Sequence, residues 1–191
     1  MTKVLLTGFE PFGTATSNPS GEIVKQISGD NIVTAILPVA YAGSAERLLA
    51  LIAEHNPDVV ICLGQAEGRT QITPEKVAIN LDDARLADNE GVLRNDVKIL
   101  VDGPDAYFTT LPINKMVEAI KAKGVPAAVS LSAGAFLCNH VFYVAQNKFV
   151  GTKVRSGFVH VPLMDSQAPE FPGMPTMPLD QMVIAVRAML E

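Results

Sequence analysis

The sequence predicts an α/β fold built on a mainly parallel sheet, because apolar runs of strand length alternate with segments of helical periodicity. Residues 4–8, 32–37 and 59–63 are almost continuously apolar, and such runs are typical of strands buried on both faces. The chain has 191 residues, 48% of them hydrophobic and 18% charged, which is enough to form a core without disulfides or metal ions. We therefore expect one globular domain over residues 1–191.

Caps and apolar stripes place helices between these strands. Asn18 is suited to cap a helix that starts at Pro19, and Ser44 is suited to cap a second helix. A third helix is expected to end at Gly124, and a fourth to follow Cys138. The apolar stripes of the second, third and last helices are Leu48, Leu49, Leu51 and Ile52; Ile113, Met116, Val117 and Ile120; and Leu179, Met182, Val183, Val186 and Met189.

Two further strands are predicted over residues 127–131 and 157–161. The stretch 64–110 breaks the alternation, being rich in Asp, Asn, Gly and Arg with short apolar alternations at 77–79 and 97–100. This pattern predicts an inserted hairpin segment on the sheet, and long connections in compact domains tend to be functional. Residues 164–178 are rich in proline and are predicted to form a surface loop.

The charge balance disfavours several classes of partner. Fifteen Lys and Arg residues against twenty Asp and Glu residues give a net charge of −5, and no basic cluster is interleaved with aromatic residues. We therefore expect no nucleic-acid partner. The apolar run near the N-terminus is too short for a signal peptide or a membrane span, which predicts a cytoplasmic protein without a membrane partner.

Cofactor motifs are also absent from the sequence. There is no G-x-x-x-x-G-K-[ST] loop, and residues 8–13 follow a predicted strand without forming G-x-G-x-x-G. The three His and two Cys residues lack C-x-x-C or H-x-x-x-H spacing. We therefore expect no nucleotide cofactor and no metal site.

Cys138 lies where a predicted strand passes through small residues into a predicted helix. At a helix N-terminus, the macrodipole and free backbone N–H groups lower the pKa of a cysteine, and the same N–H groups can stabilise an oxyanion. The alternative is a small buried side chain without a chemical role. That alternative is our interpretation of Cys62, which lies in the middle of a predicted strand.

His160 and Glu75 are the candidate partners of Cys138. His160 lies near the end of a predicted strand, and because parallel strands end at one edge of a sheet, its imidazole can meet the thiol there. Glu75 leads a strand-like run and is placed to accept the second ring N–H. The alternatives are a core histidine satisfied by backbone groups and a solvated Glu75 paired with Lys76 or Arg69. His55 and His140 have the pattern of ordinary helix or loop histidines.

Several segments, in a fixed order, carry a resemblance to a known family: Leu6–Gly13 with Asn18–Ser20, Gly64–Arg69, Glu75–Asn80, Asp83–Arg85 with Asp88–Gly91, Ser132–Gly134 with Cys138–Asn139, and Phe158–Pro162. Over essentially its whole length the chain resembles the type I pyroglutamyl peptidases, also called pyrrolidone carboxyl peptidases. The resemblance implies a cysteine peptidase in a three-layer αβα sandwich that removes an N-terminal pyroglutamyl residue from peptides and commonly forms a homotetramer.

The same resemblance assigns roles to residues of this chain. It implies a catalytic triad of Cys138, His160 and Glu75. It also implies an arginine beside the nucleophile, Arg85, and a substrate pocket formed by Phe9, Phe12, Gln65, Phe136 and Leu137.

The chain departs from the family pattern at a few positions. Glu67 and Ala87 stand where the family often has Gly and Pro, Leu131-Ser132 replaces a common Asn-Thr pair, and the segment between Cys138 and His160 is slightly short. Glu67 is expected to alter affinity near the mouth of the pocket. Two rival functions remain open from sequence: another cysteine-dependent amidase acting on a lactam or a glutamine-like amide, and a non-catalytic binder of a nucleoside or sugar.

Overall fold

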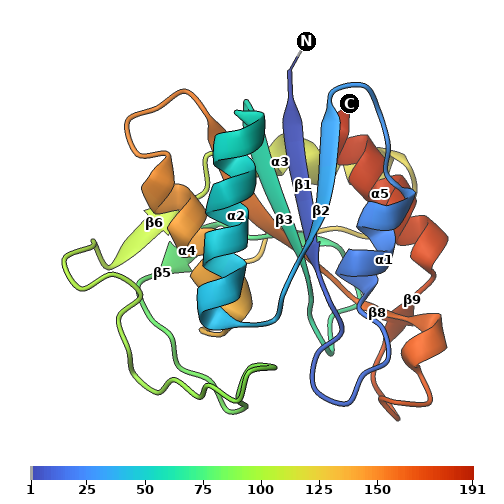
Figure 1. Ribbon diagram of the computed structural model, residues 1–191. Coiled ribbons are helices and arrows are strands. Elements are labelled where there is room, and N and C mark those ends of the chain that lie inside the picture. Colours follow the sequence, from blue (N-terminus) through green and yellow to red (C-terminus); the bar gives the residue numbers. More distant parts are fainter. Residues whose placement is uncertain (1) are drawn as a thin grey trace.

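The computed structural model describes residues 2–191 as a five-stranded sheet between two layers of helices (Figure 1). In chain order the elements are β1 (Val4–Phe9), α1 (Pro19–Gln26), β2 (Ile32–Leu37), α2 (Tyr41–His55), β3 (Val59–Gln65), β4 (Thr73–Pro74), β5 (Val77–Ile79), β6 (Ala106–Phe108), α3 (Ile113–Ala122), α4 (Leu137–Lys148), β7 (Arg155–Val161), β8 (Leu163–Met164), the 3₁₀ turn η1 (Asp165–Gln167), β9 (Thr176–Met177) and α5 (Leu179–Leu190).

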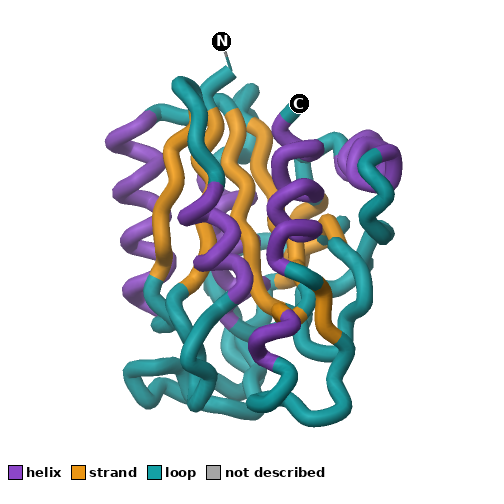
Figure 2. The backbone as a smooth tube through the Cα atoms, turned by 90° about the vertical axis from the view of Figure 1, so that its right-hand side faces the viewer, coloured by secondary structure: helices purple, strands orange, loops and turns teal. Residues whose placement is uncertain are grey.

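The strand order in the main sheet is β2-β1-β3-β7-β4. The first four of these strands are parallel, and the short β4 is antiparallel to β7. The strands lie side by side between helices, and long loops gather at their carboxyl ends, opposite the two chain termini (Figure 2). The predicted α/β class with a mainly parallel sheet is therefore confirmed.

The strands are apolar throughout because each face of the sheet is covered by helices. Neighbouring strand residues point to opposite faces, so Leu5 and Leu6, both fully buried, contribute to two different cores. Leu6 packs with the apolar stripes of α1, α3 and α5, whereas Leu5 packs with those of α2 and α4. No helix within residues 2–191 has the length and apolar character that crossing a bilayer requires.

One of the two predicted helix caps is confirmed and the other is wrong. Asn18 caps α1 by accepting a hydrogen bond from the Ser20 N–H, with Pro19 in the first turn. Helix α2 begins at Tyr41, so Ser44 lies inside it and is buried. The N–H of Tyr41 donates instead to the carboxylate of Asp88 at 2.9 Å, a partner 47 residues away that no local pattern indicates.

Two predicted strand assignments are also corrected. Residues 127–131 form only isolated bridges, between Ala127 and Ile72 and between Ser130 and Glu75, rather than a strand of the sheet. The hairpin of the inserted segment joins β5 to β6, not to residues 97–100. Val97 is 40% exposed, whereas Tyr107 in β6 packs its ring on Tyr143 of α4, and this packing selects the later segment as the partner strand.

Gly8 in β1 should be sensitive to any side chain because α1 approaches the strand closely there. A Cβ at this position would overlap the backbone carbonyl of Ser20, which cannot rotate away. We expect Gly8→Ala to lower the free energy of unfolding by about 1–3 kcal/mol, measured by urea denaturation. Gly29→Ala is the control, since its Cβ would meet only the flexible side chain of Ile32 at 3.1 Å. Equal stability of the two variants would contradict this account.

Candidate active site

A buried histidine and a buried carboxylate form a hydrogen-bonded pair at the carboxyl edge of the sheet. His160 belongs to β7, and Glu75 directly follows β4, whose antiparallel pairing brings it alongside β7. The His160 Nδ1 lies 2.7 Å from the Glu75 Oε1. Glu75 is fully buried and His160 is 4% exposed. The contact expected from the sequence is thus present, and it leaves Nε2 as the ring nitrogen that can face a reactant.

Arg69 is the third member of this cluster. Its guanidinium lies 2.8 Å from the same Glu75 oxygen, and it also donates to the Thr73 hydroxyl and to the Ser132 carbonyl. The predicted alternative of a Glu75–Arg69 pair is therefore present together with the histidine contact, but the carboxylate is buried rather than solvated. The cation compensates a buried negative charge that would otherwise be costly.

Cys138 is the second residue of α4, in the first turn of the helix. Within residues 2–191 no side chain caps this helix, so no side-chain oxygen of that part occupies the first-turn N–H groups. The sulfur lies directly over Gly64 of β3, where an added Cβ would be 2.8 Å from the sulfur and 2.7 Å from the Phe158 ring. Gly64 thus leaves the space that the thiol occupies.

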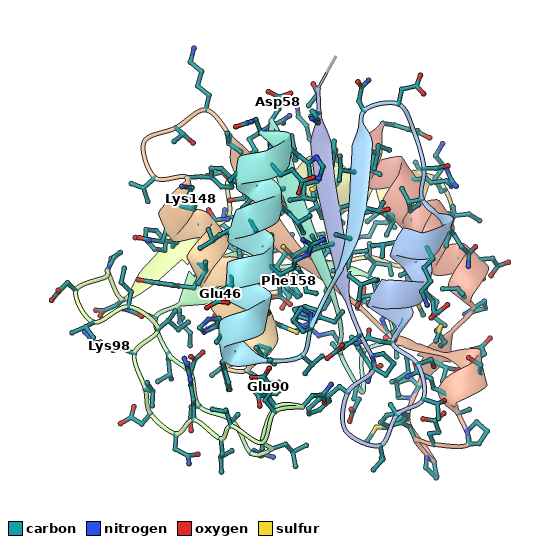
Figure 3. The ribbon with its side chains drawn as sticks, viewed as in Figure 1. Glu46, Asp58, Glu90, Lys98, Lys148 and Phe158 are labelled. Carbon is teal, nitrogen blue, oxygen red and sulfur yellow. The ribbon has the colours of Figure 1, made fainter. Side chains whose placement is uncertain are left out.

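The register of the sheet brings Cys138 to the same face as His160. Gly64 is the parallel partner of His160, and partners in adjacent strands project to one face of a sheet. Phe158 in β7 links the two groups, because it lies beside the Cys138 sulfur and its ring centroid is 4.9 Å from that of His160. Phe158 lies in the interior, between the sheet and the layer of helices that contains α2 and α4 (Figure 3).

The protonation states differ from the sequence-based prediction. Burial, followed by the negative charge of Glu75, raises the pKa of the Cys138 thiol to about 12. Burial lowers the pKa of His160, although its hydrogen bond to Glu75 opposes that shift. The expectation that the helix N-terminus lowers the thiol pKa is wrong, because burial and the Glu75 charge raise the pKa more than Arg69 and the backbone N–H of Cys138 lower it. These shifts favour a neutral pair near neutral pH, with a protonated thiol beside a neutral imidazole.

A small pocket of about 190 Å³ opens beside the Cys138 sulfur. All five residues predicted for a substrate pocket line it, and Phe12 and Phe136 approach each other with ring centroids 5.3 Å apart. Arg85, which was expected beside the nucleophile, is exposed on the inserted segment and does not line this pocket. The cation whose charge acts on Cys138 is Arg69. The full lining is Phe9, Phe12, Asn18, Val39, Gln65, Glu67, Phe136, Leu137 and Cys138.

The polar groups of the pocket are mostly committed to protein partners. Both ends of the Asn18 amide are used, by Ser20 and by the carbonyl of Glu10. The Gln65 carbonyl oxygen accepts a hydrogen bond from Gln167 at 3.0 Å, whereas its amide nitrogen has no partner within residues 2–191. Gln167 is fully buried within the segment that the sequence predicts to be a surface loop, a burial that its proline content does not reveal.

His140 belongs to a second buried ionic cluster that the sequence analysis missed. Its Nδ1 lies 2.9 Å from the carboxylate of Asp82, which also pairs with Arg94 at 2.7 Å. Arg94 lies over the ring of Tyr41, 4.4 Å from its centroid. Tyr41 in turn contacts the pocket residue Phe136 edge-on. The interpretation of His140 as an ordinary helix histidine is wrong, since it ties the inserted segment to the helix that carries Cys138.

The inserted segment also holds the loop that carries Phe12. The Asn89 amide donates to the Glu10 carboxylate at 3.1 Å and to the Pro11 carbonyl at 2.9 Å. The same Glu10 oxygen accepts the N–H of Val39, another pocket residue. Glu90, next in the chain, lies near the start of α2, at the end of the molecule opposite Asp58 (Figure 3). The segment from residue 82 to 97 thus fixes two walls of the pocket.

A thiol placed at a helix start, over a sheet edge that also holds a histidine–carboxylate pair, is typical of thiol hydrolases of the α/β class. Comparison with known proteins makes the assignment specific. The sequence profile of the pyroglutamyl peptidase family matches residues 2–191, and the chain belongs to that family. It is accordingly a cysteine-type hydrolase, as the resemblance in its motifs predicted.

Individual relatives agree with the family profile. A pyrrolidone-carboxylate peptidase from Aliivibrio fischeri (strain MJ11) is 47% identical over 200 residues, covering 100% of this chain and 94% of the relative. The crystal structure of Bacillus amyloliquefaciens pyroglutamyl peptidase I superimposes with a TM-score of 0.95 at 44% identity, covering 99% of this chain and 95% of that one. A mutant pyrrolidone carboxyl peptidase from the hyperthermophile Pyrococcus furiosus gives a TM-score of 0.93 at 37% identity, covering 98% and 96%.

The raised thiol pKa predicts how Cys138 reacts with iodoacetamide. Because the thiolate is the reactive form and the pKa is about 12, we expect the alkylation rate constant to rise about tenfold per pH unit from pH 7 to 10. The measurement is mass-spectrometric labelling in Cys62→Ser, with free glutathione as the control thiol. A rate that is already constant above pH 7 would show a stable thiolate and contradict the neutral pair.

Proposed function

We propose that this chain removes the N-terminal pyroglutamyl residue from peptides, with Cys138 as nucleophile, His160 as general base and acid, and Glu75 as the group that orients the imidazole. The observation that carries the proposal is the position of the Cys138 thiol, which lies between the His160–Glu75 pair and a small apolar pocket. Membership of the pyroglutamyl peptidase family supports the substrate. The match over residues 2–191 supports one peptidase domain.

The pocket suits a pyroglutamyl ring because that ring is small, flat and uncharged. Phe9, Phe12 and Phe136 offer aromatic faces to such a ring. The unpartnered amide nitrogen of Gln65 can donate to the lactam carbonyl. No acidic side chain lies in the buried part of the described pocket, so the ammonium of an ordinary N-terminus would lose its water there without gaining a partner.

The proposed reaction starts from the neutral pair. His160 Nε2 takes the proton of the Cys138 thiol as the sulfur attacks the pyroglutamyl carbonyl, and the lowered pKa of His160 keeps the imidazole free to act as this base near neutral pH. The first-turn N–H groups of α4 can stabilise the oxyanion of the tetrahedral intermediate. The imidazolium then protonates the leaving amine, and the C–N bond breaks to leave a thioester on Cys138. A water molecule, activated by His160, hydrolyses the thioester and restores the thiol.

Glu75 supports this cycle through the ring rather than by contact with substrate. Its carboxylate fixes Nδ1–H, so that Nε2 is the free nitrogen, and it stabilises the imidazolium that forms after proton transfer. Arg69 offsets the charge of the buried Glu75 carboxylate.

We also propose a cytoplasmic homotetramer. Both cysteines are free, which suits a reducing compartment. Several large apolar side chains are well exposed on and near the inserted segment, which supports association between copies: Leu86, Leu93, Val101, Phe108 and Leu131. Light scattering in solution distinguishes a tetramer from a monomer.

Hydrolysis of a pyroglutamyl amide tests the function and the nucleophile together. We expect wild type to cleave a pyroglutamyl peptide and to cleave the glutaminyl form of the same peptide at least about a thousandfold more slowly. The glutaminyl form carries an N-terminal ammonium, and leaving that charge unpaired in the pocket would cost roughly 4 kcal/mol. Cys138→Ala should lose at least about a thousandfold in kcat, whereas Cys62→Ser should stay active. Equal cleavage of both peptides would favour a glutamine amidase or a general aminopeptidase. A folded, inactive Cys62→Ser beside an active Cys138→Ala would exclude Cys138 as the nucleophile.

The Glu75→Gln variant tests whether Glu75 orients His160 or contributes to substrate binding. Because the amide can no longer stabilise the imidazolium, we expect kcat to fall at least about a hundredfold with little change in KM. Thermal unfolding of the variant must accompany the assay, because the change also leaves Arg69 without its buried partner. Wild-type kinetics in a folded Glu75→Gln enzyme would remove Glu75 from the triad and leave a Cys–His dyad.

A further inference from the structure

Glu67 is a charged side chain at the rim of the pocket beside Cys138. Within residues 2–191, the other lining residues are apolar or neutral, so Glu67 contributes the pocket's one formal charge. It follows β3 on the short loop that also carries Arg69. Arg69 is held by Glu75 and by the Ser132 carbonyl, whereas the Glu67 carboxylate makes no ion pair or hydrogen bond with any described residue. Its charge is therefore available to a bound molecule.

The exposure of the lining residues shows where this charge lies relative to a bound peptide. Glu67 is exposed, whereas Phe9, Asn18, Val39 and Leu137 are buried and the remaining lining residues are partly buried. A pyroglutamyl ring is the first residue of its peptide, so it must occupy the closed end while the rest of the chain leaves past Cys138 toward solvent. Glu67 lies on the open side, next to the path of the leaving peptide.

We propose that Glu67 selects the residue that follows pyroglutamate, favouring a positively charged side chain at that position and disfavouring an acidic one. This inference rests on the proposed function, because it assigns a specificity-determining residue to the same site. No cation lines the pocket within the described residues, and the Arg69 charge is already offset by Glu75. A lysine or arginine next to the scissile bond can therefore approach the free carboxylate, and an aspartate is repelled by it.

The expected effect is modest because Glu67 is exposed. Two unit charges a few ångströms apart in a solvent-like environment change kcat/KM about threefold, so a basic and an acidic substrate should differ by about tenfold at low salt. Screening shortens the range of the interaction to about 3 Å at 1 M salt. The preference should therefore shrink as ionic strength rises.

The test uses three amides that differ only in the second residue: pyroglutamyl-arginyl, pyroglutamyl-alanyl and pyroglutamyl-aspartyl. In wild type we expect kcat/KM to decrease in that order at low salt. Glu67→Gln should bring the arginyl-to-aspartyl ratio close to one, and Glu67→Lys should reverse the order. Glu118→Gln is the matched control, because it removes the same charge from an exposed position on α3, which packs on the opposite face of the sheet.

The outcomes distinguish a failure of the role of Glu67 from a failure of the proposed peptidase function. Cleavage of all three amides with an unchanged ratio in Glu67→Gln would overturn the role of Glu67 while leaving the proposed function intact. An equal shift in Glu118→Gln would attribute the preference to overall charge and would also overturn that role. If wild type cleaves none of the amides, the proposed function itself fails. A ratio that collapses in Glu67→Gln alone, and declines with salt in wild type, supports the proposal.

Discussion

The site depends on one carboxylate in a place that water does not reach. Glu75 is fully buried and shares one oxygen between His160 and Arg69. A charge in such a position is tolerated only with compensating partners, so the loop after β3, the strand β7 and the turn after β4 are held in a fixed relation. Residues 127–132 belong to the same arrangement, because Ser130 bridges to Glu75 and the Ser132 carbonyl accepts from Arg69. The contacts that position His160 beside the thiol are therefore the same contacts that hold these segments together.

The inserted segment is a brace for the pocket rather than a separate module. Asp82 holds His140 and Arg94, Asp88 caps the start of α2, and Asn89 holds the loop that carries Phe12. Each contact joins residues 47 or more positions apart, apart from the Arg94 pair. A segment with little regular structure can therefore be well determined, because its acidic and amide side chains satisfy backbone groups on the helices and loops around the site.

The sequence alone predicts the architecture and the members of the site better than it predicts their electrostatics. Continuous apolar strands and the small-residue stretch before Cys138 lead to a parallel sheet with the thiol at its edge, because both signals are local. The Asp82–His140 pair and the cap from Asp88 escape detection, since local pattern carries no information about partners so far away. The direction of the Cys138 pKa shift is mispredicted for a related reason: the helix start is visible in the sequence, whereas the burial and the Glu75 charge that raise the pKa are properties of the assembled fold. Residues 127–131 are predicted as a strand because they are mostly apolar, but they form only isolated bridges.

The uncapped start of α4 sets stability against activity at a single position. Phe136 occupies the cap position and also forms a wall of the pocket, so among the described residues no side-chain oxygen caps the first-turn N–H groups. A Ser or Asp there would stabilise the helix by about 1 kcal/mol, yet it would remove an aromatic wall and direct an acceptor at the donors the reaction needs. Selection for stability and selection for activity therefore favour different residues at position 136. The start of α4 stays uncapped because the site needs both the aromatic side chain and the free N–H groups.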